Sequence, residues 1–83
     1  MPYKRIHAAK GKTVGTKQTI KAIKKNLALV VYVADNAESH VIDPIIRACE
    51  EKKIPYIRVD SMKLLGKACG INVECATAAI TEE

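Results

Sequence analysis

The sequence contains no Phe, no Trp and only three Tyr among its 83 residues. Large aromatic side chains therefore contribute little to its interior, and a core must be built from aliphatic residues. About half of the residues are apolar, which is enough for one compact core. A chain of this length is too short to divide into two cores, so we expect residues 1–83 to form a single domain.

Long hydrophobic runs are also missing. The longest is Leu27–Ala34, and its eight residues fall far below the roughly 20 that a membrane-spanning helix requires. The first twelve residues lack the apolar stretch of a signal peptide. We therefore expect a cytoplasmic protein that has no membrane partner.

Cysteine is sparse, and the spacing of the three cysteines matches no paired motif. Cys49, Cys69 and Cys75 form no CxxC motif, and His7 and His40 lie far from them in the sequence. A zinc site needs four convergent ligands, and a buried cysteine in a reducing compartment is usually a small apolar residue. We expect no metal and no other cofactor.

The common catalytic motifs are absent as well. The sequence contains no GxSxG, P-loop, GxGxxG or HExxH pattern. The adjacent carboxylates Glu50 and Glu51 lie in a charge-mixed segment that is typical of a solvated helix end. We expect a protein that is not an enzyme and has no catalytic residues.

The hydrophobic pattern alternates between helical and extended segments. Leu27–Ala34 is an unbroken apolar run, which indicates a strand covered on both faces. Asp43 and Pro44 suit the N-cap and first position of a helix, Ser61 suits another N-cap, and Gly70 suits a helix end. We expect helices at 3–10, 15–25, 43–53 and 62–70, and strands at 12–14 (an edge strand), 27–34, 54–60 and 76–80.

These elements predict an α/β fold, a three-layer α/β/α sandwich with a mixed four-stranded sheet. The helical periodicity also predicts which side chains face the core. We expect the inward residues to be Ile6 and Ala9, then Ile20, Ile23 and Leu27, then Ile45, Ile46 and Cys49, and finally Leu64, Leu65, Ala68 and Cys69.

Positive charge gathers on the expected helix at 15–25. Its polar face carries Lys17, Lys21, Lys24 and Lys25, in a chain of net charge +5. A helix start such as Gly15–Gln18 presents free N–H groups and the positive end of the helix dipole, which favour phosphate. Gln18 can also read a base edge. A plain solvated face remains the alternative interpretation.

The segment Gly66–Cys75 has two unusual features. Gly66 lies inside an expected helix, where glycine costs about 1 kcal/mol relative to alanine, so we expect tight packing or the close approach of another backbone. Ile71 and Val73 are apolar residues in an expected loop. They either tuck under the sheet or are exposed to stack on a ligand.

Four stretches together resemble a known family. In order and spacing, GTKQTIKAIKK, ALVVYVADNAE, CEEKKIPYIRV and MKLLGKACGINVECATAAI are similar to the kink-turn-binding ribosomal proteins, which include an archaeal large-subunit protein and short bacterial homologues. The resemblance runs from about Val14 to Ile80. It implies an α/β/α sandwich, no catalysis, and a partner that is structured RNA with a kink-turn, in ribosomal RNA or a riboswitch. We expect the protein to act as a monomer.

The resemblance also implies which residues bind RNA. The basic helix enters the major groove beside sheared G·A pairs, and the loop before the last strand covers bases flipped out of the bulge. Lys17-Gln18 departs from the Asn-Glu of archaeal members and is similar to the bacterial pattern. The implied RNA-binding residues are Gly15, Thr16, Lys17, Gln18, Lys21 and Lys25 on the helix, and Ile71, Asn72, Val73 and Glu74 in the loop.

Two alternatives remain open. The related thirty-e and twelve-e ribosomal proteins share the fold, so the chain can be a ribosomal structural protein that binds another RNA motif. From a different class, a small α/β domain can use the Gly15–Gln18 helix start to bind a phosphorylated metabolite.

Overall fold

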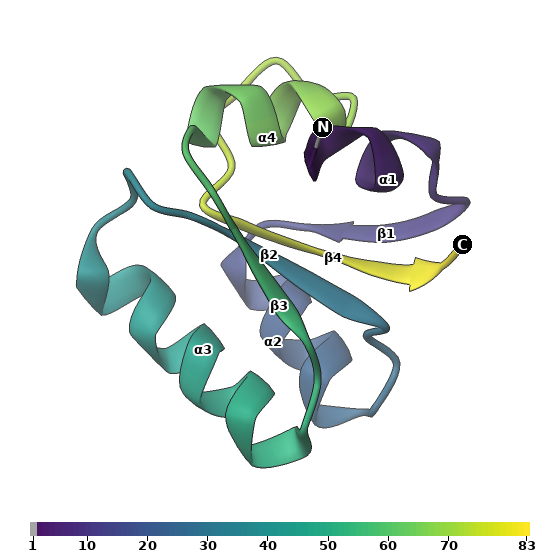
Figure 1. The fold of residues 1–83 in the computed structure, drawn as a ribbon, viewed down its shortest axis with the longest axis vertical. Helices are drawn as coiled ribbons and strands as arrows, with labels where there is room; N and C mark the ends of the chain where they lie inside the picture. The colour runs from purple at the N-terminus through teal and green to yellow at the C-terminus, as the bar shows by residue number, and fades with distance from the viewer. Residues whose placement is uncertain (1) are drawn as a thin grey trace.

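A computed structural model describes residues 2–83 and shows helices alternating with strands (Figure 1). This alternation is the order that the sequence predicted. The elements are α1 (Pro2–Ala8), β1 (Gly11–Val14), α2 (Thr16–Lys24), β2 (Val30–Ala34), α3 (Ser39–Lys52), β3 (Tyr56–Val59), α4 (Met62–Ala68) and β4 (Thr77–Glu82).

The four strands form one mixed sheet in the order β1-β4-β2-β3. Strand β2 runs parallel to β3, and β4 runs antiparallel to both of its neighbours, β1 and β2. The predicted mixed four-stranded sheet and the predicted edge position of β1 are therefore confirmed. The register pairs Val14 with Ala78 and Gly11 with Glu82, so the start of β4 lies beside the end of β1.

Helices cover both faces of the sheet, α1 and α4 on one face and α2 and α3 on the other (Figure 1). All five residues of β2 are buried. Val30, Tyr32 and Ala34 pack under α1 and α4, whereas Val31 and Val33 pack under α2 and α3. This alternation explains why the β2 sequence is apolar at every position, and it confirms the predicted three-layer α/β/α sandwich.

Helix α3 begins earlier than the sequence predicted. Asp43 is not its N-cap, because the helix begins at Ser39 and Pro44 lies inside it. The amides of Val41 and Ile42 donate to the carbonyl of Glu38, at 2.9 and 3.3 Å. Ile42 is buried in the core beneath α3, so packing of this first turn outweighs the local preference of Asp-Pro for a helix start.

Three leucines that were expected to be buried are exposed. Helix α2 ends at Lys24, and Asn26 adopts a positive φ of 59° that turns the chain. Leu27 therefore leaves the inner face of α2, and β2 starts at Val30 rather than at Leu27. The prediction of an inward Leu64 was also wrong, because α4 packs on the sheet through Leu65 and Ala68. The exposed leucines are Leu27 (55%), Leu29 (47%) and Leu64 (46%).

Other local predictions are confirmed. The hydroxyl of Ser61 caps α4 by accepting from the amide of Leu64 at 3.1 Å, and Gly70 follows the helix with a φ of +84°.

No helix within residues 2–83 is both long enough and apolar enough to cross a membrane.

Candidate nucleic-acid interface

The start of helix α2 is built around Gly15. Its φ of 94° and ψ of 158° lie in a region that is essentially restricted to glycine. The amide of Gly15 donates to the carbonyl of Thr77 at 3.0 Å, and its carbonyl accepts from the amide of Thr19 at 3.0 Å. No side chain caps the helix, so its first N–H groups and the positive end of its dipole are free to face an anion.

Buried threonines fix this helix start to the sheet. Thr19 and Thr77 are both fully buried. Their hydroxyls meet those of neighbouring threonines, Thr19 with Thr13 at 3.0 Å and Thr77 with Thr16 at 3.4 Å. The orientation of α2 is therefore set by hydrogen bonds to β1 and β4 as well as by apolar packing.

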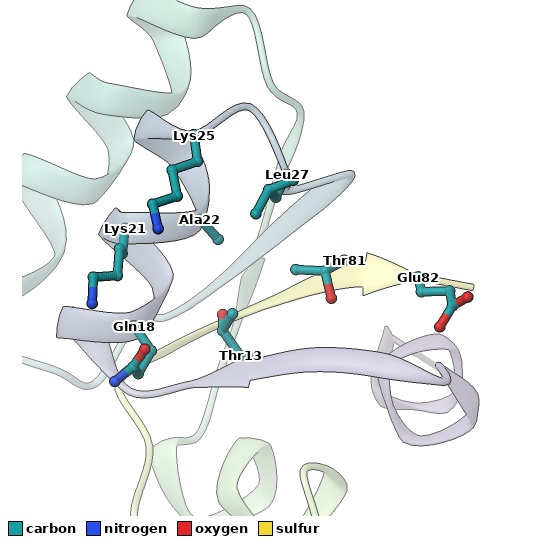
Figure 2. Close-up of a pocket in the computed structure, with 8 residues that line it drawn as sticks. All are labelled: Thr13, Gln18, Lys21, Ala22, Lys25, Leu27, Thr81 and Glu82. Atoms are coloured by element: carbon teal, nitrogen blue, oxygen red, sulfur yellow. The ribbon is translucent and has the colours of Figure 1, made fainter.

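The exposed face of α2 is basic, as the sequence predicted. Lys17, Gln18, Lys21, Lys24 and Lys25 are all exposed. Figure 2 shows Gln18 and Lys21 on α2 and Lys25 at its C-cap, with side chains of β1 and β4 on the facing side. They border a groove of about 490 Å³, which is lined by Thr13, Gln18, Lys21, Ala22, Lys25, Leu27, Thr81 and Glu82.

The loop between α4 and β4 presents a second exposed surface. Val73 is 68% exposed, which is the exposed alternative left open by the sequence, and Asn72 and Glu74 are exposed beside it. Ile71 is half-buried and packs against the core under α4. The four loop residues line a cavity of about 440 Å³ together with Lys63 and Lys67 of α4.

Close packing on α4 holds the loop in place. A Cβ atom at Gly66 would lie 2.0 Å from the carbonyl oxygen of Val73. The predicted close approach of another backbone at Gly66 is therefore confirmed. The amide of Ile71 donates to the carbonyl of Gly66 at 3.1 Å, and the amide of Cys75 donates to the carbonyl of Met62 at 3.0 Å.

The two surfaces meet at the beginning of β4. The loop leads directly into Cys75 and Thr77, and Thr77 bonds both Gly15 and Thr16 at the start of α2. The ten residues singled out from the sequence thus occupy two neighbouring segments, six on α2 and its caps and four in the loop. One end of the molecule combines a basic helix with an apolar-tipped loop.

Several residues at this end were missed by the sequence analysis. Lys63 and Lys67 line the loop cavity, and Thr13, Leu27 and Thr81 line the groove beside α2. Lys63 and Lys67 are four residues apart on α4, so they share one face of that helix. This four-residue spacing of two lysines, immediately before the loop, is the sequence pattern that could have identified them. Thr13, Leu27 and Thr81 gave no such signal, because only the packing of α2 on β1 and β4 brings them beside its basic face.

Within residues 2–83, no three His, Cys, Asp or Glu side chains lie close enough together to hold a metal ion. Glu50 and Glu51 are both exposed near the end of α3.

The fold and this surface define a small α/β protein with a basic helix start beside a short loop. Residues 3–83 match the model of the Ribosomal protein L7Ae/L30e/S12e/Gadd45 family. The chain belongs to this family.

Similar proteins are found in several bacteria. The chain is 46% identical over 80 residues to an RNA-binding protein of Geobacillus sp. (strain WCH70), covering 96% of this chain and 98% of that protein. It is 45% identical over 80 residues, with the same coverage, to an RNA-binding protein of Halalkalibacterium halodurans. An RNA-binding protein of Caldanaerobacter subterraneus is 50% identical over 68 residues, which are 82% of this chain and 83% of that one.

Solved structures share the fold. The 15.5kD RNA binding protein of Giardia lamblia superposes with a TM-score of 0.86 at 26% identity, covering 98% of this chain and 68% of that one. A Bacillus halodurans protein of unknown function superposes with a TM-score of 0.83 at 21% identity, covering 96% of this chain and 80% of that one. The second likeness supports the fold alone.

Proposed function

We propose that this protein is a non-catalytic RNA-binding protein that recognises and stabilises kink-turns. The observation that carries the proposal is the meeting of the α2 start and the 71–74 loop at the first residues of β4. Membership of the family and the RNA-binding names of its relatives support RNA as the partner. We further propose a cytoplasmic monomer that associates with ribosomal RNA or another structured RNA.

The shape of a kink-turn suits the two surfaces. An ordinary RNA duplex hides its base edges in a deep, narrow major groove. A sharp bend opens that groove and crowds phosphates together. The uncapped start of α2 and the exposed amines of Lys17, Lys21 and Lys25 supply the positive charge that crowded phosphates require.

The loop suits unpaired bases. Single-stranded bases are bound by stacking and by contacts to their exposed edges. Val73 offers an exposed apolar surface on which an unpaired base can stack. The amide of Asn72 and the carboxylate of Glu74 are exposed beside it. Lys63 and Lys67, across the loop cavity, add positive charge for the backbone of the same nucleotides.

Recognition of a kink predicts a strict dependence on RNA shape. In band-shift assays, we expect binding to a kink-turn to require its sheared G·A pairs and to persist when the flanking helices change sequence. Specific binding normally exceeds non-specific binding by orders of magnitude, so a plain duplex that binds within about threefold of the kink-turn would overturn the proposal.

The same assay separates the alternatives. A ribosomal protein specific for another RNA motif would ignore the kink-turn and shift a different structured RNA. A domain that binds a phosphorylated metabolite at Gly15–Gln18 would bind neither RNA, and protein purified from cells would carry no nucleic acid that absorbs near 260 nm.

Lys21 and Gln18 are expected to have different roles on one helix. Lys21→Ala removes a phosphate contact, so it should weaken binding to every kink-turn alike and reduce the slope of log K against log salt by roughly 0.7–0.9. Gln18→Ala removes a base contact, so it should cost about 1–3 kcal/mol and reduce discrimination against altered G·A pairs. The salt slope should stay unchanged for Gln18→Ala.

Lys10 provides the matched control for this experiment. It is exposed just before Gly11, which pairs with Glu82 at the opposite end of β4 from Thr77. Lys10→Ala should leave both the affinity and the salt slope close to those of the parent protein. Equal slope changes in all three variants, or no loss in any, would mean that the lysines form only a solvated face.

A further inference from the structure

Two cysteines stand at the two ends of the proposed RNA-binding loop. Cys69 is the C-cap of α4 and is half-buried, and Cys75 is buried directly after the loop. Gly66 and Cys69 are three residues apart and share one face of α4. A Cβ atom at Gly66 would lie 3.5 Å from the amide nitrogen of Cys75, so this face of α4 lies against Cys75.

The two thiols interact with each other. A hydrogen bond from Cys69, together with the backbone amides of Gly15 and Thr77, lowers the pKa of the Cys75 thiol to about 7 although burial opposes this. The same interaction and burial raise the pKa of Cys69. The Cys75 thiol donates a hydrogen bond to the carbonyl oxygen of Thr77 at 2.9 Å, which favours its protonated form. The pKa of about 7 is the balance of these opposing effects, so Cys75 forms a thiolate beside the Cys69 thiol near neutral pH.

Cys49 lies apart from this pair. It is fully buried under α3, on the opposite face of the sheet. Burial raises its pKa to about 11, so it stays a protonated thiol in the core. It behaves as the small apolar residue that the sequence predicted and serves as an internal control.

We propose that Cys69 and Cys75 form a modification site at which a hydroperoxide creates an intramolecular disulfide, and that this bond weakens RNA binding. The second half of this proposal rests on the proposed function. The affected surface is the 71–74 loop together with the start of α2.

The chemistry balances with hydrogen peroxide as the oxidant. The Cys75 thiolate attacks one peroxide oxygen, the O–O bond breaks, and the sulfur becomes a sulfenic acid while hydroxide leaves and is protonated to water. The Cys69 sulfur then attacks the Cys75 sulfur, the S–S bond forms, and a second water leaves with the proton of Cys69. Two thiols lose two electrons and two protons, and one peroxide is reduced to two waters.

A disulfide here alters both halves of the RNA site. It holds the two Cα atoms about 5.5–6 Å apart and imposes its own torsion on the ends of the loop. The loop is pinned to α4 by the amides of Ile71 and Cys75, so a shift of Cys75 is transmitted to Val73. Cys75 also contacts Gly15 and Thr77, so the same shift disturbs the start of α2.

Intact mass measurement tests the disulfide. After treatment of the folded protein with hydrogen peroxide, we expect the mass to fall by two hydrogen atoms and to return on reduction with dithiothreitol. Peptide mapping should link Cys69 to Cys75. Cys49→Ser should still show the loss, and Cys69→Ser should not. No mass loss, a gain of oxygen without cross-linking, or a bond to Cys49 would overturn the modification site.

Affinity for a kink-turn RNA tests its consequence. We expect the oxidised protein to bind at least about fivefold more weakly, the scale of one lost stacked base, and reduction to restore binding. Cys69→Ser should retain its affinity under peroxide, with thermal melting to show that it is folded. A disulfide that forms without loss of affinity would overturn only the proposed effect of oxidation on RNA binding. If the reduced protein failed to bind a kink-turn, both that effect and the proposed function would be overturned. The mass measurement would still test the disulfide by itself.

Discussion

Replacement of Gly66 by alanine is expected to lower the free energy of unfolding by about 3 kcal/mol, the upper part of the range for overpacked cores. The new Cβ atom would lie 2.0 Å from the carbonyl oxygen of Val73, which is backbone and cannot rotate away. At an ordinary helical position the same substitution stabilises by about 1 kcal/mol, so the sign of the effect is itself diagnostic. Denaturant unfolding followed by circular dichroism measures it.

Gly70 provides the comparison. A Cβ atom at Gly70 would meet no atom within 4 Å, but its φ of +84° strains any other residue. Gly70→Ala should therefore cost about 1–2 kcal/mol, through backbone strain alone. We expect Gly66→Ala to be the more damaging of the two. A Gly66→Ala variant as stable as the parent protein would show that α4 and the loop separate easily.

Gly66→Ala should also reduce binding to RNA. The loop must move away from α4 to make room for the methyl group, and Val73 moves with it. Gly70→Ala leaves the contact between Gly66 and Val73 in place. A larger loss of affinity for Gly66→Ala than for Gly70→Ala, measured below both melting temperatures, would place the effect in the packing of the loop on α4.

Much of the fold was predictable because the local signals agree with the tertiary structure. The apolar run ending at Ala34 required cover on both faces, and the helices on the two sides of the sheet provide it. Gly66 opposed local helix preference, and the reason is the backbone of Val73. Such a conflict between a residue and its expected element is informative because packing is the usual cause.

The errors arose where distant contacts decide the structure. The start of α3 depends on burial of Ile42, which local preferences around Asp43 and Pro44 do not report. Leu27 and Leu64 fit a helical period but lie where no neighbouring element covers them. Apolar periodicity marks the residues that can be buried, while chain reversals such as that at Asn26 decide which of them are.

The candidate site likewise combines a feature that is local in the sequence with one that depends on distant contacts. The basic face of α2 is a local property and was visible in the sequence. The meeting of that helix with the loop depends on the bond from Gly15 to Thr77, which joins residues far apart in the chain. Within the sequence, only the resemblance to a family connects the two segments, and no spacing rule does so.

Val73→Asp is expected to weaken RNA binding without unfolding the protein. Val73 is 68% exposed, so the variant should fold and melt close to the temperature of the parent protein. In the complex, the carboxylate would replace an apolar surface against unpaired bases and would lie close to phosphates. We expect a loss of about 1–3 kcal/mol, the scale of losing base stacking.

Two further variants separate the causes of this loss. Val73→Asn has nearly the shape of the aspartate without its charge, so it reports the loss of the apolar contact alone. Leu29→Asp adds the same charge at an exposed apolar residue whose amide bonds Ile80, away from the start of β4. It reports the general effect of one added negative charge on a polyanionic ligand, and that effect should fade as salt rises.

We expect the affinities to fall in the order Leu29→Asp, Val73→Asn, Val73→Asp, with the last the weakest. The gap between the two Val73 variants should narrow at high salt, because it reflects charge near phosphate. The gap between Val73→Asn and the parent protein should persist, because it reflects lost base contact. If Val73→Asp lowers the melting temperature strongly, the Val73 side chain has a structural role, and the loss of affinity reflects unfolding. If it binds RNA as tightly as Leu29→Asp, the loop lies outside the interface, and α2 alone must account for recognition.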